Sequence, residues 1–296
     1  MKSAVRLRAV AIACSLATGV LVSGQQLPSE PARAFGASIT GAFEGWFQNE
    51  DGSYSFLVGY LNRNRGRDEE IPIGPNNRIE PGTPDMGQPT HFLRGRHVGM
   101  FVVTVPKDFT PQQRLTWTLT INGQTTVIPL RLNRDYNVSP FLIAHTKTFR
   151  NTPPGIRFEE RGTAIRGPVG TAIKPAVTRT TSLSSPLSLT VWSDDDAMYS
   201  SGTGAPLRGS TLPVRLEWTK YRGPGQVTFD KERPDIEKLA GGNVGEPFRG
   251  KSTTSVKFSA PGEYMLHLTA NDYSGDGGGG EVCCWTTALV KVTVTQ

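Results

Sequence analysis

Hydrophobic and polar residues alternate over short stretches along most of the chain, as they do in strands that bury one face. Residues 115–121 give the clearest case, because Leu, Trp and Ile alternate there with threonine. Asn122-Gly123 follows, and residues 125–132 return. Asn-Gly readily takes the positive φ values of a two-residue hairpin turn, so we expect an antiparallel hairpin.

The same pattern predicts further strands toward the N-terminus. Residues 43–47 and 54–61 are joined through Asp51-Gly52, which is again a hairpin-turn pair. Residues 98–105 supply another strand. At least five strands result, which is typical of a sandwich or open barrel over residues 41–140.

The C-terminal half has stretches of strand length with β-branched or aromatic residues, at the spacing of an immunoglobulin-like sandwich. They are residues 187–192, 212–219, 226–229, 253–258, 263–271 and 282–295. We expect an all-β chain with two β-sandwich-like domains in tandem. The domains cover residues 41–140 and 156–296, with a linker at 141–155.

The N-terminus has the layout of a secretory signal peptide. Basic residues precede an uncharged run at 9–22, which is short for a bilayer span of roughly 20 residues. We place the signal peptide at 1–24 and a flexible N-terminus, rich in small residues, Pro and Gln, at 25–40. The processed protein is then expected to be secreted, periplasmic or on the cell surface, without a membrane span.

The formal net charge of +6 overstates the basicity of the processed protein. Cleavage after residue 24 removes Lys2, Arg6 and Arg8 and no acidic residue, so +6 less 3 leaves +3. In the rest of the chain basic and acidic residues are interspersed, whereas nucleic-acid binders gather Lys and Arg on one face. We therefore expect no nucleic-acid partner.

Several motifs follow one another in the C-terminal half: Asn151-Thr152-Pro153-Pro154, Pro186-Leu187-Ser188-Leu189, Leu216-Glu217-Trp218, and Pro261-Gly262-Glu263-Tyr264 leading to Asp272. In order and spacing they resemble the PKD-type, immunoglobulin-like repeats of secreted and surface proteins. The resemblance implies that Trp218 packs in the core and that Tyr264 opens the strand that leads to Asp272. A tyrosine after Pro-Gly also suits a corner in which the ring is buried and the hydroxyl bonds backbone.

A proline-rich segment, residues 71–92, interrupts the strands of the N-terminal half. With the Phe-Glu-Gly-Trp-Phe run at 43–47, its Ile-Gly-Pro-Asn-Asn-Arg run resembles a module of exported bacterial proteins, which implies no particular activity. Loops of this length in compact domains are usually functional or disordered. The polar candidates for a binding surface are Asn76, Asn77, Arg78, Asp85, Gln88 and His91. The plainer alternative is a stiff loop that caps one sheet face.

Aspartates gather in two loops that a sandwich of this strand order brings to one end. Calcium takes about 6 to 8 oxygen ligands, and neighbouring aspartates in Gly-rich loops can supply them. The calcium candidates are Asp194, Asp195, Asp196, Asp272 and Asp276. The alternative is that these carboxylates are solvated. The sequence indicates no other cofactor.

Cys283-Cys284 is the cysteine pair left after removal of the leader. A vicinal disulfide, two free thiols and an intermolecular bond are the competing arrangements. Export into an oxidising compartment weakens the case for free thiols. The glycine run at 277–280 leaves room for the distorted backbone of a vicinal bridge, which we favour.

The sequence contains few motifs that indicate catalysis or ligand binding. Residues 245–252 match the G-x-x-x-x-G-K-S spacing of a phosphate-binding loop, but a β-patterned stretch follows where that loop needs a helix, so we reject the match. The sequence has neither a G-x-S-x-G elbow nor an H-E-x-x-H pair. Aromatic residues that either bind glycans or belong to the core are Trp46, Tyr60, Trp117 and Trp285.

Together these observations favour a non-enzymatic interaction protein, secreted or in the cell envelope, that presents loops of two β domains to a protein or polysaccharide partner. One alternative is a divergent extracellular hydrolase, or an accessory subunit, with its site at residues 71–97, around Asp85 and His91. The other alternative is a structural spacer. A carboxylate and a histidine converging in one hollow would favour the enzyme.

Overall fold

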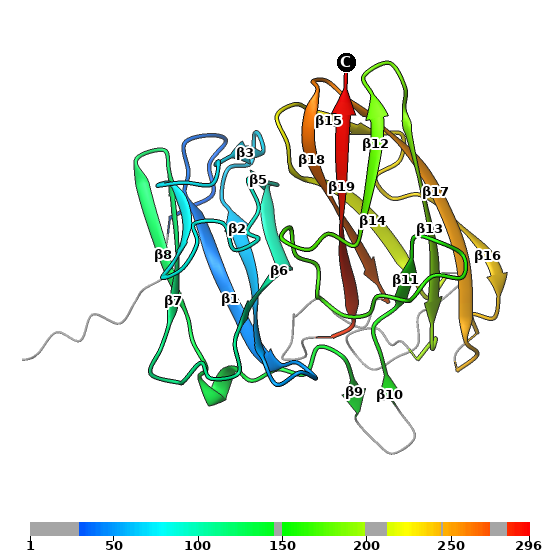
Figure 1. Cartoon of the computed structure of the whole chain (residues 1–296), viewed down its shortest axis with the longest axis horizontal. Helices are drawn as coiled ribbons and strands as arrows, with labels where there is room; N and C mark the ends of the chain where they lie inside the picture. Colours follow the sequence, from blue (N-terminus) through cyan, green and yellow to red (C-terminus); the bar gives the residue numbers. More distant parts are fainter. Residues whose placement is uncertain (1–29, 145–149, 199–211, 244, 273–282) are drawn as a thin grey trace, which may run out of the picture. The chain divides into compact units, whose positions relative to one another are not determined.

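The computed structural model describes residues 30–144, 150–198, 212–243, 245–272 and 283–296 (Figure 1). Pro31–Gln296 forms one compact unit. The predicted signal peptide at 1–24 lies outside the described residues. Within the part of the chain that is described, no helix is long and apolar enough to cross a membrane.

The N-terminal half is a β-sandwich of two sheets, in the orders β1-β2-β6 and β4-β7-β8. Their strands are β1 (Ile39–Gln48), β2 (Tyr54–Asn62), β6 (Gly95–Val105), β4 (Asn77–Glu80), β7 (Leu115–Ile121) and β8 (Gln124–Leu130). Side chains from both sheets, among them Phe56, Phe101 and Trp117, pack into one core. Short strands β3 (Glu69–Glu70) and β5 (His91–Phe92) pair beside it.

Both predicted hairpins are confirmed. β1 pairs antiparallel with β2, and β7 pairs with β8 through Asn122 and Gly123, whose φ values are 53° and 73°. The folded part begins earlier than predicted. Residues 37–40 are buried, and the backbone N–H of Ala37 donates to Asn64 Oδ1 at 2.8 Å, although the sequence predicted a flexible stretch there.

The C-terminal half is a second β-sandwich. One sheet has the order β11-β13-β17-β15, with β16 also paired to β17, and the other has the order β12-β19-β18-β14. The strands are β11 (Gly155–Arg157), β12 (Val177–Ser182), β13 (Leu187–Asp195), β14 (Arg215–Arg222), β15 (Val227–Phe229), β16 (Ile236–Ala240), β17 (Phe248–Phe258), β18 (Gly262–Asn271) and β19 (Trp285–Thr295). A 3-10 turn, η1 (Arg134–Tyr136), and the short strands β9 (Ile143–Ala144) and β10 (Arg150–Asn151) lie between the halves in sequence.

The predicted core markers of the second sandwich are buried. Trp218 and Tyr264 are each 1% exposed. The Tyr264 hydroxyl donates to the carbonyl of Ala260 at 2.8 Å, which is the contact expected of a tyrosine corner. The all-β class and the tandem sandwiches are therefore confirmed, while the PKD-type resemblance stays a prediction.

The segment with phosphate-loop spacing forms part of a sheet. β17 begins at Phe248, inside that segment, and runs to Phe258. Because a strand follows the glycines where a phosphate loop requires a helix, the rejection of that motif is confirmed.

Strand β14, at the edge of its sheet, is one of the places where the two halves are in contact. Its register with β18 shifts between Lys220 and Arg222, so Tyr221 is the extra residue of a β-bulge. Tyr221 is fully buried and belongs to the core cluster of the N-terminal half. An uncovered edge strand is prone to pairing with other chains, and here residues of the proline-rich loop cover it. We call this contact between residues 220–222 and the loop the joint.

Candidate functional site

Asn77 and Gln88, two of the predicted binding residues, are fully buried. The Asn77 side chain donates to the carbonyls of Ile71 and Pro89 at 2.9 and 2.7 Å and accepts from Trp117 Nε1 at 3.0 Å. The Gln88 amide donates to the Pro84 carbonyl at 2.7 Å and accepts from the backbone of Met86 at 2.9 Å. Both side chains hold the loop in shape, because they satisfy backbone groups that a loop leaves unpaired.

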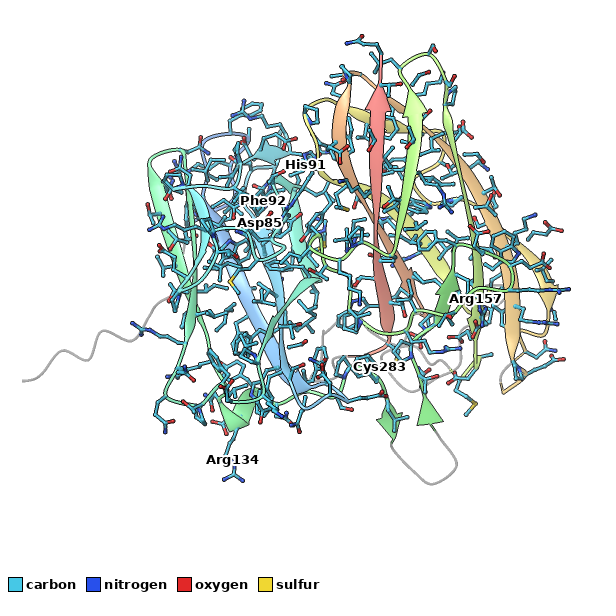
Figure 2. The ribbon with its side chains drawn as sticks, in the orientation of Figure 1. Asp85, His91, Phe92, Arg134, Arg157 and Cys283 are labelled. Carbon is cyan, nitrogen blue, oxygen red and sulfur yellow. A yellow bond between two sulfur atoms is a disulfide. The ribbon has the colours of Figure 1, made fainter. Side chains whose placement is uncertain are left out.

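Asp85 belongs to the joint. Its side chain is labelled in Figure 2. The carboxylate accepts two hydrogen bonds from the Arg222 guanidinium, both at 2.8 Å. These bonds lower the pKa of Asp85 in spite of partial burial. Beside this pair, the Tyr221 hydroxyl donates to the Gly87 carbonyl at 2.5 Å, and the N–H of Thr90 donates to the Tyr221 carbonyl at 3.2 Å. The carboxylate that the hydrolase alternative requires is thus engaged in a structural ion pair.

His91 is engaged as well. Its Nδ1 lies 2.7 Å from Glu70 Oε1, and Lys220 Nζ lies 2.6 Å from the same oxygen. Burial opposes ionisation of Glu70, but the bonds from His91 and Lys220 lower the pKa of its carboxyl. Asn76 and Arg78 are the remaining candidates, and Arg78 pairs with Glu80 at 2.8 Å. A binding role for the six loop residues stays a prediction, and the contacts of most of them serve the loop and the joint.

A cleft lies next to the joint, where the two halves meet. Val58 pairs with Phe101 but Tyr60 pairs with His97, so β6 carries a bulge around Gly99. Gly99 has φ of 55°, and a Cβ there would lie 2.3 Å from Cζ2 of Trp285 at the start of β19. The bulge therefore needs glycine both for its backbone and for the close approach of the indole.

Trp285 is packed against the outer face of the N-terminal sheet. It forms a cluster with Phe47, Leu57 and Val102 and is only 2% exposed. The indole ring is thus a core element, and Trp285 is also one of the residues that line the cleft.

The cleft, which we call the junction cleft, has a volume of about 280 Å³. One side is formed by β6 and the residues before it, and the other by alternate residues of β14 and β18 that share one sheet face. Cross-strand pairs from that face are Arg215 with Asn271, Glu217 with Thr269, and Thr219 with His267. The lining residues are Leu93, Arg96, His97, Val98, Met100, Arg215, Glu217, Thr219, Arg233, His267, Thr269, Asn271 and Trp285.

Three polar side-chain atoms on residues of the cleft lining are buried without a hydrogen-bond partner among the described residues. They are Trp285 Nε1, Thr219 Oγ1 and His267 Nε2. Buried polar groups in native proteins are nearly always hydrogen-bonded, and leaving one unpaired costs roughly 1–3 kcal/mol. A polar group at the edge of a hollow can recover this cost when a ligand supplies the partner.

The histidines of the cleft are neutral at neutral pH. Burial lowers the pKa of His267 to about 4, in spite of the Met100 backbone beside it. His267 stacks on Tyr221 with ring centroids 5.8 Å apart. Burial also lowers the pKa of His97, whose Nε2 lies 3.0 Å from the Arg94 carbonyl. Charge in the cleft therefore comes from its arginine and glutamate residues.

Arginines dominate the charged groups of the lining. Arg96 donates to Glu44 at 2.5 Å, and Arg233 donates to Glu217 at 2.9 Å. Arg215 also lines the cleft and is exposed. Three arginines and the single carboxylate of Glu217 line the cleft, and Glu44 pairs with Arg96 from outside the lining.

The predicted calcium residues are distributed over both faces of the end of β13. Asp194 pairs with Arg157 at 2.6 Å and with Arg166, and Asp196 accepts from the Thr152 hydroxyl at 2.7 Å. Asp195 is buried. Burial, and to a smaller extent the negative charges of the nearby Asp272 and Asp196, raises the pKa of its carboxyl to about 9.

Asp272 is also fully buried, whereas Asp276 lies outside the described residues. Among the residues that are described, no group of three or more His, Cys, Asp or Glu side chains is arranged to hold a metal. Calcium binding stays a prediction.

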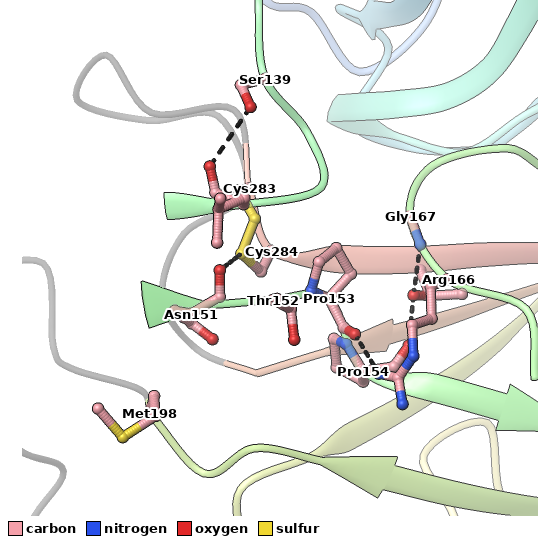
Figure 3. Close-up of a disulfide and its surroundings, with 12 residues drawn as sticks. Ser139, Asn151, Thr152, Pro153, Pro154, Arg166, Gly167, Met198, Cys283 and Cys284 are labelled. Carbon is pink, nitrogen blue, oxygen red and sulfur yellow. Dashed lines mark hydrogen bonds between the residues drawn. A yellow bond between two sulfur atoms is a disulfide. The ribbon is translucent and has the colours of Figure 1, made fainter. Parts of the chain in front are cut away.

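Cys283 and Cys284 are joined by a disulfide directly before Trp285 (Figure 3). Both are fully buried, and the peptide bond between them is cis. The backbone N–H of Asp272 donates to the Cys284 carbonyl at 3.4 Å, and Cys284 Sγ lies 3.6 Å from the carbonyl oxygen of Asn151. The vicinal bridge thus lies at the start of β19, beside Asn151 and Asp272.

The sequence pointed to Trp285 only as one of four aromatic residues, and three of the four are almost completely buried. The fourth, Trp46, is half-buried and its Nε1 donates to the Asn133 carbonyl at 2.7 Å. The other residues of the junction cleft, such as Thr219 and His267, were assigned to strands without a role. No local pattern could have identified them, because the cleft joins segments that are far apart in sequence.

Comparison with known proteins adds little. No family model and no curated protein sequence matches the chain. Among solved structures, domains 4 and 5 of the S-layer protein SbsC match with 12% identity and a TM-score of 0.23, over 67% of this chain and 71% of that one. AggA, the major subunit of aggregative adherence fimbriae type I from Escherichia coli, matches with 17% identity and a TM-score of 0.20, over 41% of this chain and 92% of that one. At these TM-scores the similarity supports no argument about fold or function.

Proposed function

We propose that the protein is a non-enzymatic binding protein, exported to the cell surface or secreted, and that it holds a polysaccharide segment in the junction cleft. The observation that carries the proposal is the pair of buried polar atoms beside the cleft, Trp285 Nε1 and Thr219 Oγ1, that have no partner among the described residues. A polysaccharide could supply separate acceptors for the indole N–H and for the threonine hydroxyl.

The joint supports this function because it fixes the two sides of the cleft. The Arg222–Asp85 pair is bidentate, and Tyr221 is buried in the core of the other half. Both features resist movement of one half against the other. A binding site that is already formed loses less conformational entropy when its ligand arrives.

The size of the cleft favours a polysaccharide over a protein partner. Stable protein interfaces bury about 800 Å² on each partner, whereas this site is a hollow of about 280 Å³ with mainly polar lining residues. A narrow polar hollow suits one sugar unit of a longer chain.

The hydrolase alternative has less support. Its named residues, Asp85 and His91, form ion pairs with Arg222 and Glu70, and neither lines the junction cleft. A general acid or base must be free to reach the substrate.

Affinity electrophoresis of the protein through gels that contain different soluble polysaccharides would test the proposal. We expect at least one polysaccharide to retard the wild type and Trp285→Phe to weaken that retardation about tenfold, because the substitution removes the N–H donor together with part of the ring. Trp192→Phe is the matched control, since Trp192 lies on β13 outside the cleft. Equal retardation of all three proteins would contradict the assignment of the site, and no retardation by any polysaccharide would contradict the function.

A further inference from the structure

We infer that two copies of the chain associate by pairing the uncovered edge of β13, so that one sheet continues from copy to copy. This surface lies outside the proposed binding site, because no residue of β12 or β13 lines the junction cleft. Its two features are a free backbone edge and a hollow beside that edge.

One edge of β13 is paired over only part of its length. On one side β17 pairs with all of Leu187–Asp195, whereas on the other side β11 pairs only with residues 192–194. Among the described residues, no strand or bridge pairs with the outer edge of residues 187–191. Alternate residues of a strand direct their N–H and C=O groups to each side, so this edge presents unpaired backbone groups.

The sequence of this edge lacks the residues that usually prevent pairing. Natural edge strands are protected by lysine, proline, a bulge or a covering loop. Residues 187–191 read Leu-Ser-Leu-Thr-Val, and their register with β17 has no shift. In contrast, β14 is covered by the proline-rich loop, and β16 carries Glu237, Lys238 and a shift in register before Ala240. The edge of β13 is therefore open to a further strand.

A hollow of about 210 Å³ lies beside this edge, between β13 and β12. Leu189 from one sheet and Val290 from the other belong to its lining, so the hollow reaches the seam of the sandwich. Phe158, Val177 and Leu187, which pack against the same core, are only partly buried. A strand added to β13 would shield these apolar side chains from water.

The same edge of a second copy fits as the added strand. When two such strands pair antiparallel about a two-fold axis at Leu189, each Ser188 lies opposite Thr190 of the other copy. Each Leu187 then lies opposite Val191 of the other copy. Pairs of hydroxyl side chains and pairs of apolar side chains both stabilise a sheet, and a two-fold axis repeats each pair.

The charges beside the edge also suit a second copy. Arg179 and Glu159 both line the hollow and pair with each other at 3.2 Å. The lining thus has one charge of each sign, and two identical surfaces can meet without net repulsion. A strongly basic or strongly acidic peptide would find no excess charge to match.

Sedimentation velocity at protein concentrations from about 1 to about 100 µM tests the inference, and we expect a dimer at the upper end because the interface is small. Ser188→Lys places a charge on the free edge and should raise the Kd of the dimer at least about tenfold. Ser255→Lys is the matched control, because Ser255 pairs with Ser188 but lies on β17, one strand inside the edge. It should change the Kd by less than about threefold.

A cross-link tests the pairing of the two edges directly. Residues 188 and 190 of opposite copies would have Cα atoms roughly 4.5 to 5.5 Å apart, which is within the range of a disulfide. Ser188→Cys combined with Thr190→Cys should therefore form a covalent dimer on air oxidation. Ser255→Cys combined with Lys257→Cys, which has the same spacing one strand inside the edge, should stay monomeric.

Two outcomes would overturn the inference. One is a wild type that stays monomeric at every concentration together with a cysteine variant that does not cross-link, and this result would point to an extended segment of another protein at the edge. The other is a dimer that Ser188→Lys leaves unchanged or that both lysine variants weaken equally, because another surface would then hold the copies together. Equal urea midpoints for the wild type and the lysine variants verify that each variant is folded.

Discussion

The proline-rich loop and the junction cleft are both rich in polar residues, yet they differ in how those residues are paired. In the loop, Asn77, Gln88 and Asp85 each make several hydrogen bonds to groups of the protein itself. In the cleft, Trp285 Nε1 and Thr219 Oγ1 are buried and make none with the described residues. A polar composition therefore does not identify a binding surface, and the pairing of the polar atoms does.

The difference has a simple origin. The amides of Asn77 and Gln88 donate to carbonyls within about a dozen residues, as Asn77 does at Ile71 and Pro89. The cleft residues lie mainly on β6, β14, β18 and β19. Strand pairing fixes their positions, whether or not a hydrogen-bond partner lies within reach. Substitutions that disrupt one region at a time test this difference.

The largest effect is expected for Gly99→Ala. The new Cβ would meet the indole of Trp285 in a backbone conformation with positive φ, so both strain and a clash result. We expect a loss of about 4 kcal/mol in unfolding free energy and loss of polysaccharide binding. Gly95→Ala is the matched control, because Gly95 also has positive φ on β6 but nothing within 4 Å. Urea titration measures the unfolding free energy of both variants, and equal losses would refute a role for the indole contact.

Asn77→Ala should destabilise the protein by about 3 kcal/mol. The substitution leaves the carbonyls of Ile71 and Pro89 and the N–H of Trp117 without their partner. Asn76→Ala, at the neighbouring exposed position, should change the unfolding free energy by less than about 0.5 kcal/mol. Similar urea midpoints for the two variants would show that the loop does not depend on this buried amide.

His267 should make the protein less stable in acid. Its pKa is lowered to about 4 in the folded state, so between pH 6.5 and 4 the unfolded chain binds more protons and stability falls as pH falls. The stabilisation from the neutral ring is complete above about pH 6.5, and about 2 to 3 kcal/mol is lost by pH 4. His267→Phe keeps a ring against Tyr221 and removes the titration, so its stability should depend less on pH over this range. Parallel pH profiles for wild type and variant would contradict this.

Calcium is expected to have the smallest effect. Extracellular calcium modules have Kd values of roughly 0.1 to 1 mM, so about 1 mM calcium should add about 1 kcal/mol of stability if Asp195 and Asp272 bind it. Asp272→Asn should abolish the increase. Differential scanning calorimetry with calcium and with magnesium as the control measures it, and an unchanged Tm with calcium would remove the calcium hypothesis.

Much of the fold could be predicted from the sequence because it depends on local signals. Asn122-Gly123 predicted one hairpin turn, which is confirmed. The resemblance to PKD-type repeats implied a core position for Trp218, and the Pro-Gly before Tyr264 suited a buried corner; both side chains are buried. The short strands and the bulge at Gly99 could not be predicted, since their pairing depends on residues distant in sequence. For the same reason Thr219 and His267 carried no signal of a shared cleft.

The most direct test of the central claim uses the indole N–H groups of the five tryptophans as probes in a nitrogen–proton correlation spectrum. Trp285 Nε1 reports on the junction cleft, whereas Trp117 Nε1 donates to Asn77 and reports on the loop. On titration with a polysaccharide that retards the protein in gels, we predict that the Trp285 signal shifts in a saturable way and that the Trp117 signal stays in place. A shift of Trp117 with Trp285 unchanged would contradict the account and return the binding site to the proline-rich loop.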